Sequence, residues 1–159
     1  MSSEEKPTEA VAQMHIQRLY VKNVSFEAPN SPEVFQVQNW QPKIEVQFHT
    51  NSKPLTDGLY EAVVTVTVTA KLDDKVAYLV EVEQAGIFSV VNFPADQVHY
   101  LLGAYCPGIL FPYARQVVAE AIMNGGFPAL HLAPMNFEAL YEQQMQQQQA
   151  DDARIIRES

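Results

Sequence analysis

The sequence is poor in cysteine and in positive charge. Its 159 residues include one cysteine, Cys106, and 10 Lys and Arg against 19 Asp and Glu, which gives a formal net charge of −9. One thiol cannot form an internal disulfide or a multi-thiolate zinc site. Because nucleic-acid binding rests on clustered cations, we expect no direct binding of nucleic acid.

Signals for secretion, membrane insertion and ATP hydrolysis are also missing. The amino-terminal string MSSEEKPTEA lacks the basic start and apolar core of a secretory signal, which predicts a cytoplasmic protein. The longest uncharged stretch, residues 97–114, contains two prolines and is short for a bilayer-spanning helix, so no direct membrane insertion is expected. No GxxxxGK[ST] string occurs, which argues against ATP hydrolysis.

No group of residues points to catalysis or to a metal. The histidines are far apart and never spaced as HxH or HxxxH: His15, His49, His99 and His131. On an unkinked helix, Cys106 would lie about 10 Å from His99, too far for a nucleophile and its base. We therefore predict no catalytic residue, no metal site, no cofactor and no enzyme activity.

Four segments have the hydrophobic pattern of strands. Apolar and polar residues alternate over residues 44–48, 60–70 and 76–84, and more weakly over 15–26. Asp73-Asp74 is a plausible hairpin turn. Because the connections look too short for helical crossovers, the pattern predicts a four-stranded antiparallel meander.

Two helices are expected after the strands. Apolar residues follow helical spacing over residues 96–123, with Asp96 as a possible start cap and Gly125-Gly126 as the stop. Pro107 and Pro112 should kink or interrupt this long helix. A shorter helix begins after Asn136. The fold class is therefore α+β, with helices covering one face of the sheet.

The two ends differ from the middle of the chain. Residues 1–13 are polar and acidic, residues 14–142 form the single expected domain, and residues 143–159 open with a glutamine run. We favour a flexible carboxy-terminal tail, although the glutamine run is also compatible with a continued helix.

The long helix predicts self-assembly. Between residues 97 and 119 its only formal charge is Arg115, and apolar residues occur nearly all round it. One side covers the sheet, and a second copy of the chain is the usual cover for the other. The alternative is a helix buried wholly within one chain.

Several aromatic residues lie in or beside proline-bearing connections. They either plug the ends of the core or line a groove for apolar segments of a partner. These residues are Phe35, Trp40, Phe93, Phe127 and Phe137.

Particular strings resemble those of the SecB family of protein-export chaperones. The strings are SFEAPN (25–30), WQP (from Trp40), GIFS (86–89), LGAYCPGILFPYAR (102–115) and LAPMNF (132–137), and the similarity covers about residues 15–141. The resemblance implies a cytoplasmic homotetramer, a dimer of dimers. It would hold unfolded precursor proteins without ATP and deliver them to the zinc-bearing carboxy-terminal tail of the SecA motor.

The resemblance also assigns residues. The family's acidic SecA-docking face falls on Glu27, Leu79 and Glu81, and Glu83 is also outward. Asn23 departs from the aspartate of similar proteins, so one charge of that face is missing, and Glu83 is its candidate substitute. The expected oligomer interface comprises Val80, Val82 and Gln84 on the sheet and Tyr105, Cys106 and Ile109 on the long helix.

A groove for non-native clients is expected at Trp40, Val46, Phe48, Phe137, Leu140 and Tyr141. Main-chain pairing and loose apolar contact would give low sequence specificity. Three alternatives remain open: a small-molecule hotdog-type enzyme, a pure assembly scaffold, and a chaperone dedicated to a toxin–antitoxin pair.

Overall fold

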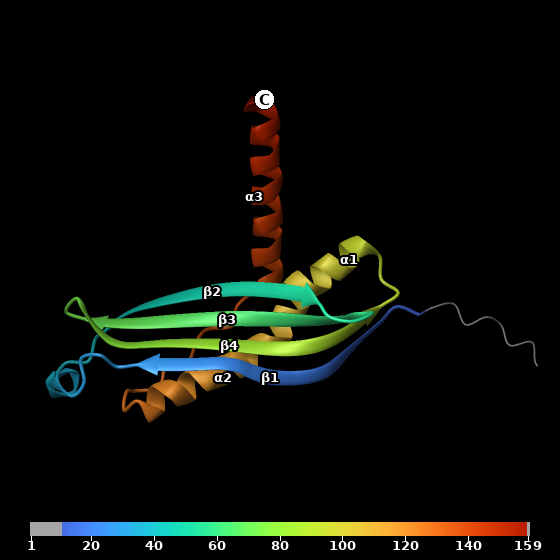
Figure 1. Ribbon diagram of the computed structural model, residues 1–159. Helices are drawn as coiled ribbons and strands as arrows, with labels where there is room; N and C mark the ends of the chain where they lie inside the picture. The colour runs from blue at the N-terminus through green and yellow to red at the C-terminus, as the bar shows by residue number, and fades with distance from the viewer. Residues whose placement is uncertain (1–10, 159) are drawn as a thin grey trace, which may run out of the picture.

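A single antiparallel sheet forms the body of the protein (Figure 1). The computed structural model describes residues 11–158. The strands are β1 (Gln13–Glu27), β2 (Lys43–Pro54), β3 (Leu59–Leu72) and β4 (Lys75–Val91). The helical segments are η1 (Glu33–Gln36), α1 (Ala95–Tyr100), η2 (Leu101–Tyr105), α2 (Cys106–Asn124) and α3 (Phe137–Glu158).

All four predicted strands are confirmed, each with wider bounds than the alternation indicated. The turn between β3 and β4 lies at Asp73 and Asp74, as expected, with backbone φ angles of 51° and 65°. Two consecutive positive φ angles are typical of a type I′ hairpin turn, whose twist matches that of the strands. Asp tolerates this conformation better than most residues other than glycine.

The strand order is β1-β4-β3-β2, so the meander prediction is correct for β2, β3 and β4 and wrong for β1. β1 pairs antiparallel with β4, from Gln13 opposite Val91 to Glu27 opposite Leu79. The segment that contains η1 carries the chain from one edge of the sheet to the other. Hydrophobic alternation indicates which face a strand buries, not which neighbour it has, and therefore did not reveal this crossing.

The core lies between the sheet and the long helix, which crosses one face of the sheet (Figure 1). The inward valines of the two central strands are fully buried, as the alternation predicted: Val64, Val66, Val68, Val80 and Val82. From α2, Leu110, Val118 and Ile122 pack against them, each with 0% exposure.

The helix continues past both prolines. The segment η2, immediately before Pro107, is π-helical, and such segments commonly accommodate a disturbance of the regular hydrogen-bond ladder. Pro112 lies inside α2 and does not end it. The carbonyl that its ring approaches belongs to Gly108, which is exposed and has no side chain to crowd the turn.

The ends of the helices follow the expected signals with one exception. α2 stops at Gly125-Gly126, where Gly126 has a φ of 89° and the amide of Phe127 donates to the carbonyl of Ile122 at 3.2 Å. Asn136 caps α3 through its side-chain oxygen, which accepts from the amide of Ala139 at 3.0 Å. Asp96 is not a cap, because the helix begins one residue earlier, at Ala95.

The expectation of a flexible tail after residue 142 is wrong for residues 143–158, which continue α3. Glutamine has a favourable helix propensity, so the run extends the helix that Asn136 starts. α3 has 22 residues and stands away from the sheet (Figure 1). Most of the expected amino-terminal tail, residues 1–10, lies outside the described residues.

Cys106 provides a test of this packing. Its side chain has 0% exposure, and burial raises the pKa of the thiol to about 12. Only the thiolate reacts quickly with alkylating reagents. Native protein should therefore be labelled far more slowly than denatured protein, as measured by mass spectrometry over time. Equal rates in the two states would contradict the burial of Cys106.

Candidate functional site

The edge strand β2 carries a row of apolar side chains. Ile44, Val46 and Phe48 are half-buried on the side that faces the helices, and each packs against the core. Within the described sheet β2 pairs only with β3, so its other backbone edge is unpaired. The row is therefore an apolar strip beside a free strand edge, which is the arrangement that added strands use.

Trp40 lies at one end of this row, in an aromatic cluster built around Phe127. The ring of Phe127 is 5.5 Å from Trp40, 5.0 Å from Tyr78 and 4.9 Å from Phe35. Phe127 is 5% exposed, whereas Phe35 is 50% exposed and Trp40 is half-buried. The cluster thus closes the end of the core and also presents aromatic surface to solvent.

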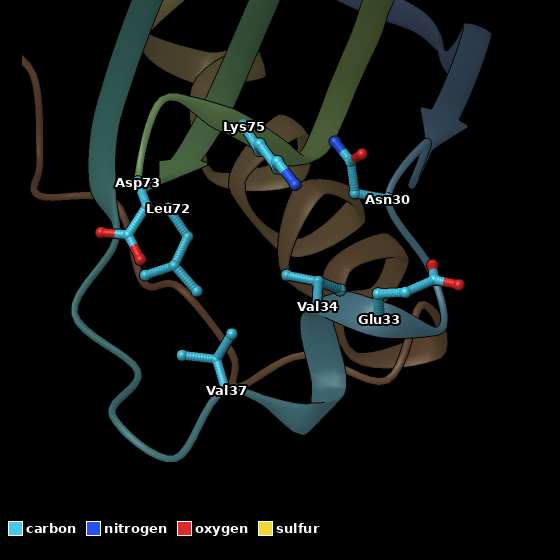
Figure 2. Close-up of a pocket in the computed structure, with 7 residues that line it drawn as sticks. All are labelled: Asn30, Glu33, Val34, Val37, Leu72, Asp73 and Lys75. Atoms are coloured by element: carbon cyan, nitrogen blue, oxygen red, sulfur yellow. The ribbon is translucent and has the colours of Figure 1, made fainter.

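A hollow of about 370 Å³ lies between η1 and the β3–β4 turn (Figure 2). Val34, Val37 and Leu72 form its apolar lining. The ammonium group of Lys75 extends over the hollow, and the carboxylate of Glu33 points outward (Figure 2). The hollow has the size of a small ligand pocket and suits an apolar side chain.

A second aromatic cluster lies at the other end of the row. The ring of Phe111 on α2 is 5.7 Å from Phe48 and 5.6 Å from Phe137. Phe111 and Phe137 are each only 4% exposed. Phe137 is therefore covered at its described position, and its part in a client groove stays a prediction. Phe111 was missed because its helical spacing is also that of an ordinary core residue.

The remaining predicted groove residues lie at the base of α3. Leu140 is half-buried and packs against the core. Tyr141 is half-buried, its hydroxyl is hydrogen-bonded to Nδ1 of His99, and its ring faces Gly103. The structure thus brings Phe48, Phe137, Leu140 and Tyr141 to one region, although part of that region is covered.

The opposite face of the sheet holds the expected acidic group. Directly paired residues share a face, and the register places Glu27 opposite Leu79 and Asn23 opposite Glu83. Glu27 is exposed, and Leu79, Glu81 and Glu83 are half-buried. The hydroxyl of Thr67 donates to Glu81 at 3.2 Å. The four predicted residues therefore form one outward patch, and Glu83 lies beside the position where Asn23 lacks a charge.

Sequence patterns missed a buried carboxylate on the same face. Glu61 is 8% exposed and accepts hydrogen bonds from the hydroxyl of Tyr20 and, at 2.9 Å, from Lys22. Burial acts to raise the pKa of Glu61, but the hydrogen bonds and the charges of Lys22 and Lys53 outweigh it and lower the pKa. Burial and the same carboxylate raise the pKa of Tyr20 to about 12. These contacts span β1 and β3 across β4.

The predicted interface residues divide into two groups. The side chains of Val80, Val82 and Cys106 have 0% exposure within one chain, so they could support an oligomer interface only from beneath its surface. Tyr105 is 50% exposed and Ile109 is half-buried. Gln84 is 3% exposed, and its Oε1 has no hydrogen-bond partner among the described residues.

Residues 11–158 have neither a cluster of metal-ligating side chains nor a helix suited to a membrane. No group of three or more His, Cys, Asp or Glu side chains is placed to hold a metal ion. Among the helices formed by these residues, none combines the length and apolar character that a membrane span requires.

The fold resembles that of a solved chaperone. A SecB-like chaperone of Mycobacterium tuberculosis, Rv1957, in complex with a ChAD peptide from the Rv1956 HigA1 antitoxin, superposes with a TM-score of 0.62. It is 12% identical in sequence, and the match covers 77% of this chain and 87% of that one. The chain therefore has the fold of SecB-like chaperones.

Sequence comparison is more specific. Residues 7–148 match the family described as preprotein translocase subunit SecB. The protein-export protein SecB of Methylococcus capsulatus is 52% identical over 155 residues, covering 96% of this chain and 98% of that protein. The SecB of Nitrosococcus oceani is 50% identical over 147 residues, covering 92% and 90%. The chain belongs to the SecB family.

The Glu61 contacts predict a pH-dependent contribution to stability. Since its pKa is lowered on folding, the carboxylate stabilises the fold above the ordinary carboxyl range, and this contribution is lost as pH falls through the folded-state pKa. Replacing Glu61 with Gln should lower the free energy of unfolding by about 1–3 kcal/mol at neutral pH. Urea titrations should show that the difference in unfolding free energy between variant and wild type shrinks below about pH 4. A difference independent of pH would contradict this assignment.

Proposed function

We propose that the protein is an ATP-independent holdase chaperone. It binds extended, non-native segments of precursor proteins in the cytoplasm and keeps them competent for export. The observation that carries the proposal is the half-buried apolar row of β2 beside an unpaired strand edge. Such a surface offers backbone pairing and apolar contact without requiring a particular sequence. Trp40 and the hollow between η1 and the β3–β4 turn extend this client surface.

Three features favour export over the alternatives. The relatives at 50–52% identity are named protein-export protein SecB, which favours general export over service to one toxin–antitoxin pair. The hotdog-type enzyme usually has its long helix early among the strands, whereas here the helix follows all four. A pure scaffold has no need for an apolar row beside a free edge.

The proposed assembly is a homotetramer, a dimer of dimers. On β1, the helix-facing side chains Ile16, Val21 and Val24 are 49%, 44% and 45% exposed. On the long helix, Tyr105 and Tyr113 are 50% and 47% exposed. A second copy would cover both sets, and symmetric pairing of like surfaces is the common solution. Beneath this surface, within one chain, lie the buried side chains of Val80, Val82 and Cys106, which would support it.

The outward acidic patch is the proposed docking site for the zinc-bearing carboxy-terminal tail of SecA. Leu79 offers an apolar anchor, and Glu27, Glu81 and Glu83 place negative charge around it. Such a patch attracts a basic segment and steers its approach. Any zinc at this contact would belong to the partner.

Client binding tests the proposed function directly. An unfolded precursor should bind the purified oligomer, its folded form should not, and the emission of Trp40 should shift to the blue. Val46→Asp should weaken binding by about tenfold, since it places a charge on the apolar row. The neighbouring Gln47→Asp, on the other face, should bind normally. Equal binding of folded and unfolded forms would reject the holdase function.

Charge reversal tests the docking patch. Glu81→Lys should weaken binding of the SecA tail, more at low salt than at high, because exposed charges are screened over about 10 Å at 0.1 M ionic strength. Asp57→Lys makes the same charge change in the β2–β3 connection and should have little effect. Calorimetry measures tail affinity, and sedimentation should report an unchanged oligomer. Unchanged tail affinity for Glu81→Lys would mean that the patch is wrongly assigned.

A further inference from the structure

One end of the outward face of the sheet is basic. Four residues there form a single row across the strands, because each is directly paired with the next: Arg18, Ile87, Glu61 and Lys53. The ammonium group of Lys22 lies 2.9 Å from a carboxylate oxygen of Glu61, and that of Lys53 lies 3.9 Å from the same oxygen. We name Arg18, Lys22 and Lys53 the basic end.

The basic end holds more positive charge than Glu61 neutralises. The strand ends around Glu61 contain no other Asp or Glu: residues 13–22, 50–54, 59–63 and 84–91. One carboxylate therefore faces three cations. Arg18 is exposed, and the side chains of Lys22 and Lys53 are 42% and 58% exposed, so the surplus charge is open to solvent. In a chain with only 10 Lys and Arg, this is a concentrated basic surface.

Glu61 orders this surface. The side chains of Tyr20 and Lys22 pass over β4 to reach Glu61 on β3, and Ala85 of β4, which pairs with Tyr20, has 0% exposure. A lysine that is already bonded to a buried carboxylate loses less side-chain freedom on binding a ligand than a free surface lysine does. Lys22 and Lys53 are therefore preorganised to receive a further anionic group.

Strand β4 joins the basic end to the acidic docking patch. Leu79 and Ile87 are half-buried apolar residues that share the outward face, since their separation of eight residues is even and side-chain direction alternates along a strand. This separation corresponds to about 26 Å. Acidic residues surround Leu79, and basic residues surround Ile87. Two further lysines of this face, Lys43 and Lys71, lie beyond Leu79, at the opposite end from Ile87.

Net charge decides which occupant the basic end can hold. The chain has a formal net charge of −9, so the protein as a whole repels an acidic partner. An acidic group is held here only when a neighbouring contact tethers it, because tethering raises its local concentration. The docking patch around Leu79, on the same strand, supplies such a contact for a basic segment.

We propose that the outward face binds a bipolar segment of its docking partner. A basic, apolar part lies on the docking patch, and an acidic part about eight extended residues away lies on the basic end. The inference rests on the proposed docking at Leu79 and adds a second contact to it. The second contact fixes the direction of the segment along β4, and it favours segments of mixed charge over segments that are basic throughout.

Three synthetic peptides probe this arrangement. The bipolar peptide has a Lys-Leu-Arg end, a ten-residue Gly-Ser spacer that reaches up to about 35 Å, and two glutamates at the other end. The neutral peptide has glutamine in place of both glutamates. The short peptide keeps the glutamates on a two-residue spacer, which reaches at most about 7 Å.

Calorimetry on the purified oligomer should show a second contact for the bipolar peptide alone. At an ionic strength of about 0.1 M, we expect it to bind about twofold to fivefold more tightly than the neutral peptide, which is the usual contribution of an exposed charge pair. The advantage should shrink at about 1 M, where screening is stronger. The short peptide should bind no more tightly than the neutral one, because its glutamates do not reach the basic end.

Variants locate the second contact. Arg18→Glu should abolish the advantage of the bipolar peptide, and Lys53→Gln, on the other edge strand, should reduce it. Neither should change the affinity of the neutral peptide, because about 26 Å separates the basic end from Leu79 and screening acts over about 10 Å at 0.1 M. Arg154→Glu is the matched control for Arg18→Glu, since it makes the same charge change on α3, which stands away from the sheet (Figure 1).

The outcomes distinguish the second contact from the docking patch. Sedimentation should show the wild-type oligomer for each variant, and Lys53→Gln carries the test if Arg18→Glu alters it. Equal affinity of the bipolar and neutral peptides for wild type would overturn the second contact and leave the docking patch standing. An advantage that survives both substitutions would overturn the assignment of the acidic part to the basic end. Wild type that binds neither peptide would overturn the attraction of a basic segment to the docking patch, and the second contact with it.

Discussion

The arrangement of apolar surface depends on one difference in width: the sheet is wider than the helix that covers it. Four strands spaced about 4.8 Å apart make a sheet about 19 Å wide, whereas a helix with its side chains is about 10–12 Å across. One helix therefore covers the two central strands and not the two at the edges. The helix-facing valines at the middle of β3 and β4, Val64, Val66, Val68, Val80 and Val82, are accordingly at 0% exposure. The apolar side chains of β1 and β2 on the same face remain exposed or half-buried. A soluble chain with two uncovered apolar strips needs a second covering for each.

The strand order decides how these strips are separated. Because β1 lies beside β4, the two edges of the sheet are β1 and β2, and the long helix runs between their apolar strips. The same pairing sets Glu27 against Leu79 and Asn23 against Glu83 on the far face. Had β1 paired with β2, Glu27 would not have lain opposite Leu79, although Glu81 and Glu83 share a strand with it. The strand order thus places two apolar edges and an acidic patch on separate surfaces.

Much of this was predictable from the sequence, for physical reasons. Strict alternation identified the strands and the faces of Val80, Glu81 and Val82, since side-chain direction in a strand has a period of two. Caps and turns such as Asn136 and Asp73-Asp74 act over a few residues and were read correctly. Long-range features were not: the place of β1 in the sheet, the Glu61 contacts and the burial of Phe137 depend on residues that are far apart in the sequence. The glutamine run was misjudged because its composition is compatible with both helix and coil.

The two apolar strips call for different coverings. A strip on β1 that pairs with another copy can be covered permanently, because the partner's shape never changes. Under the proposed function, the strip on β2 would receive segments of many sequences. A permanent cover would then prevent client binding, whereas a bare strip invites aggregation. The base of α3 covers Phe111 and Phe137 at the far end of the β2 strip, so part of the apolar surface there is already hidden within one chain. The chain itself therefore treats the two edges of the sheet differently: β1 keeps exposed apolar side chains, whereas the β2 strip ends against side chains that α3 covers.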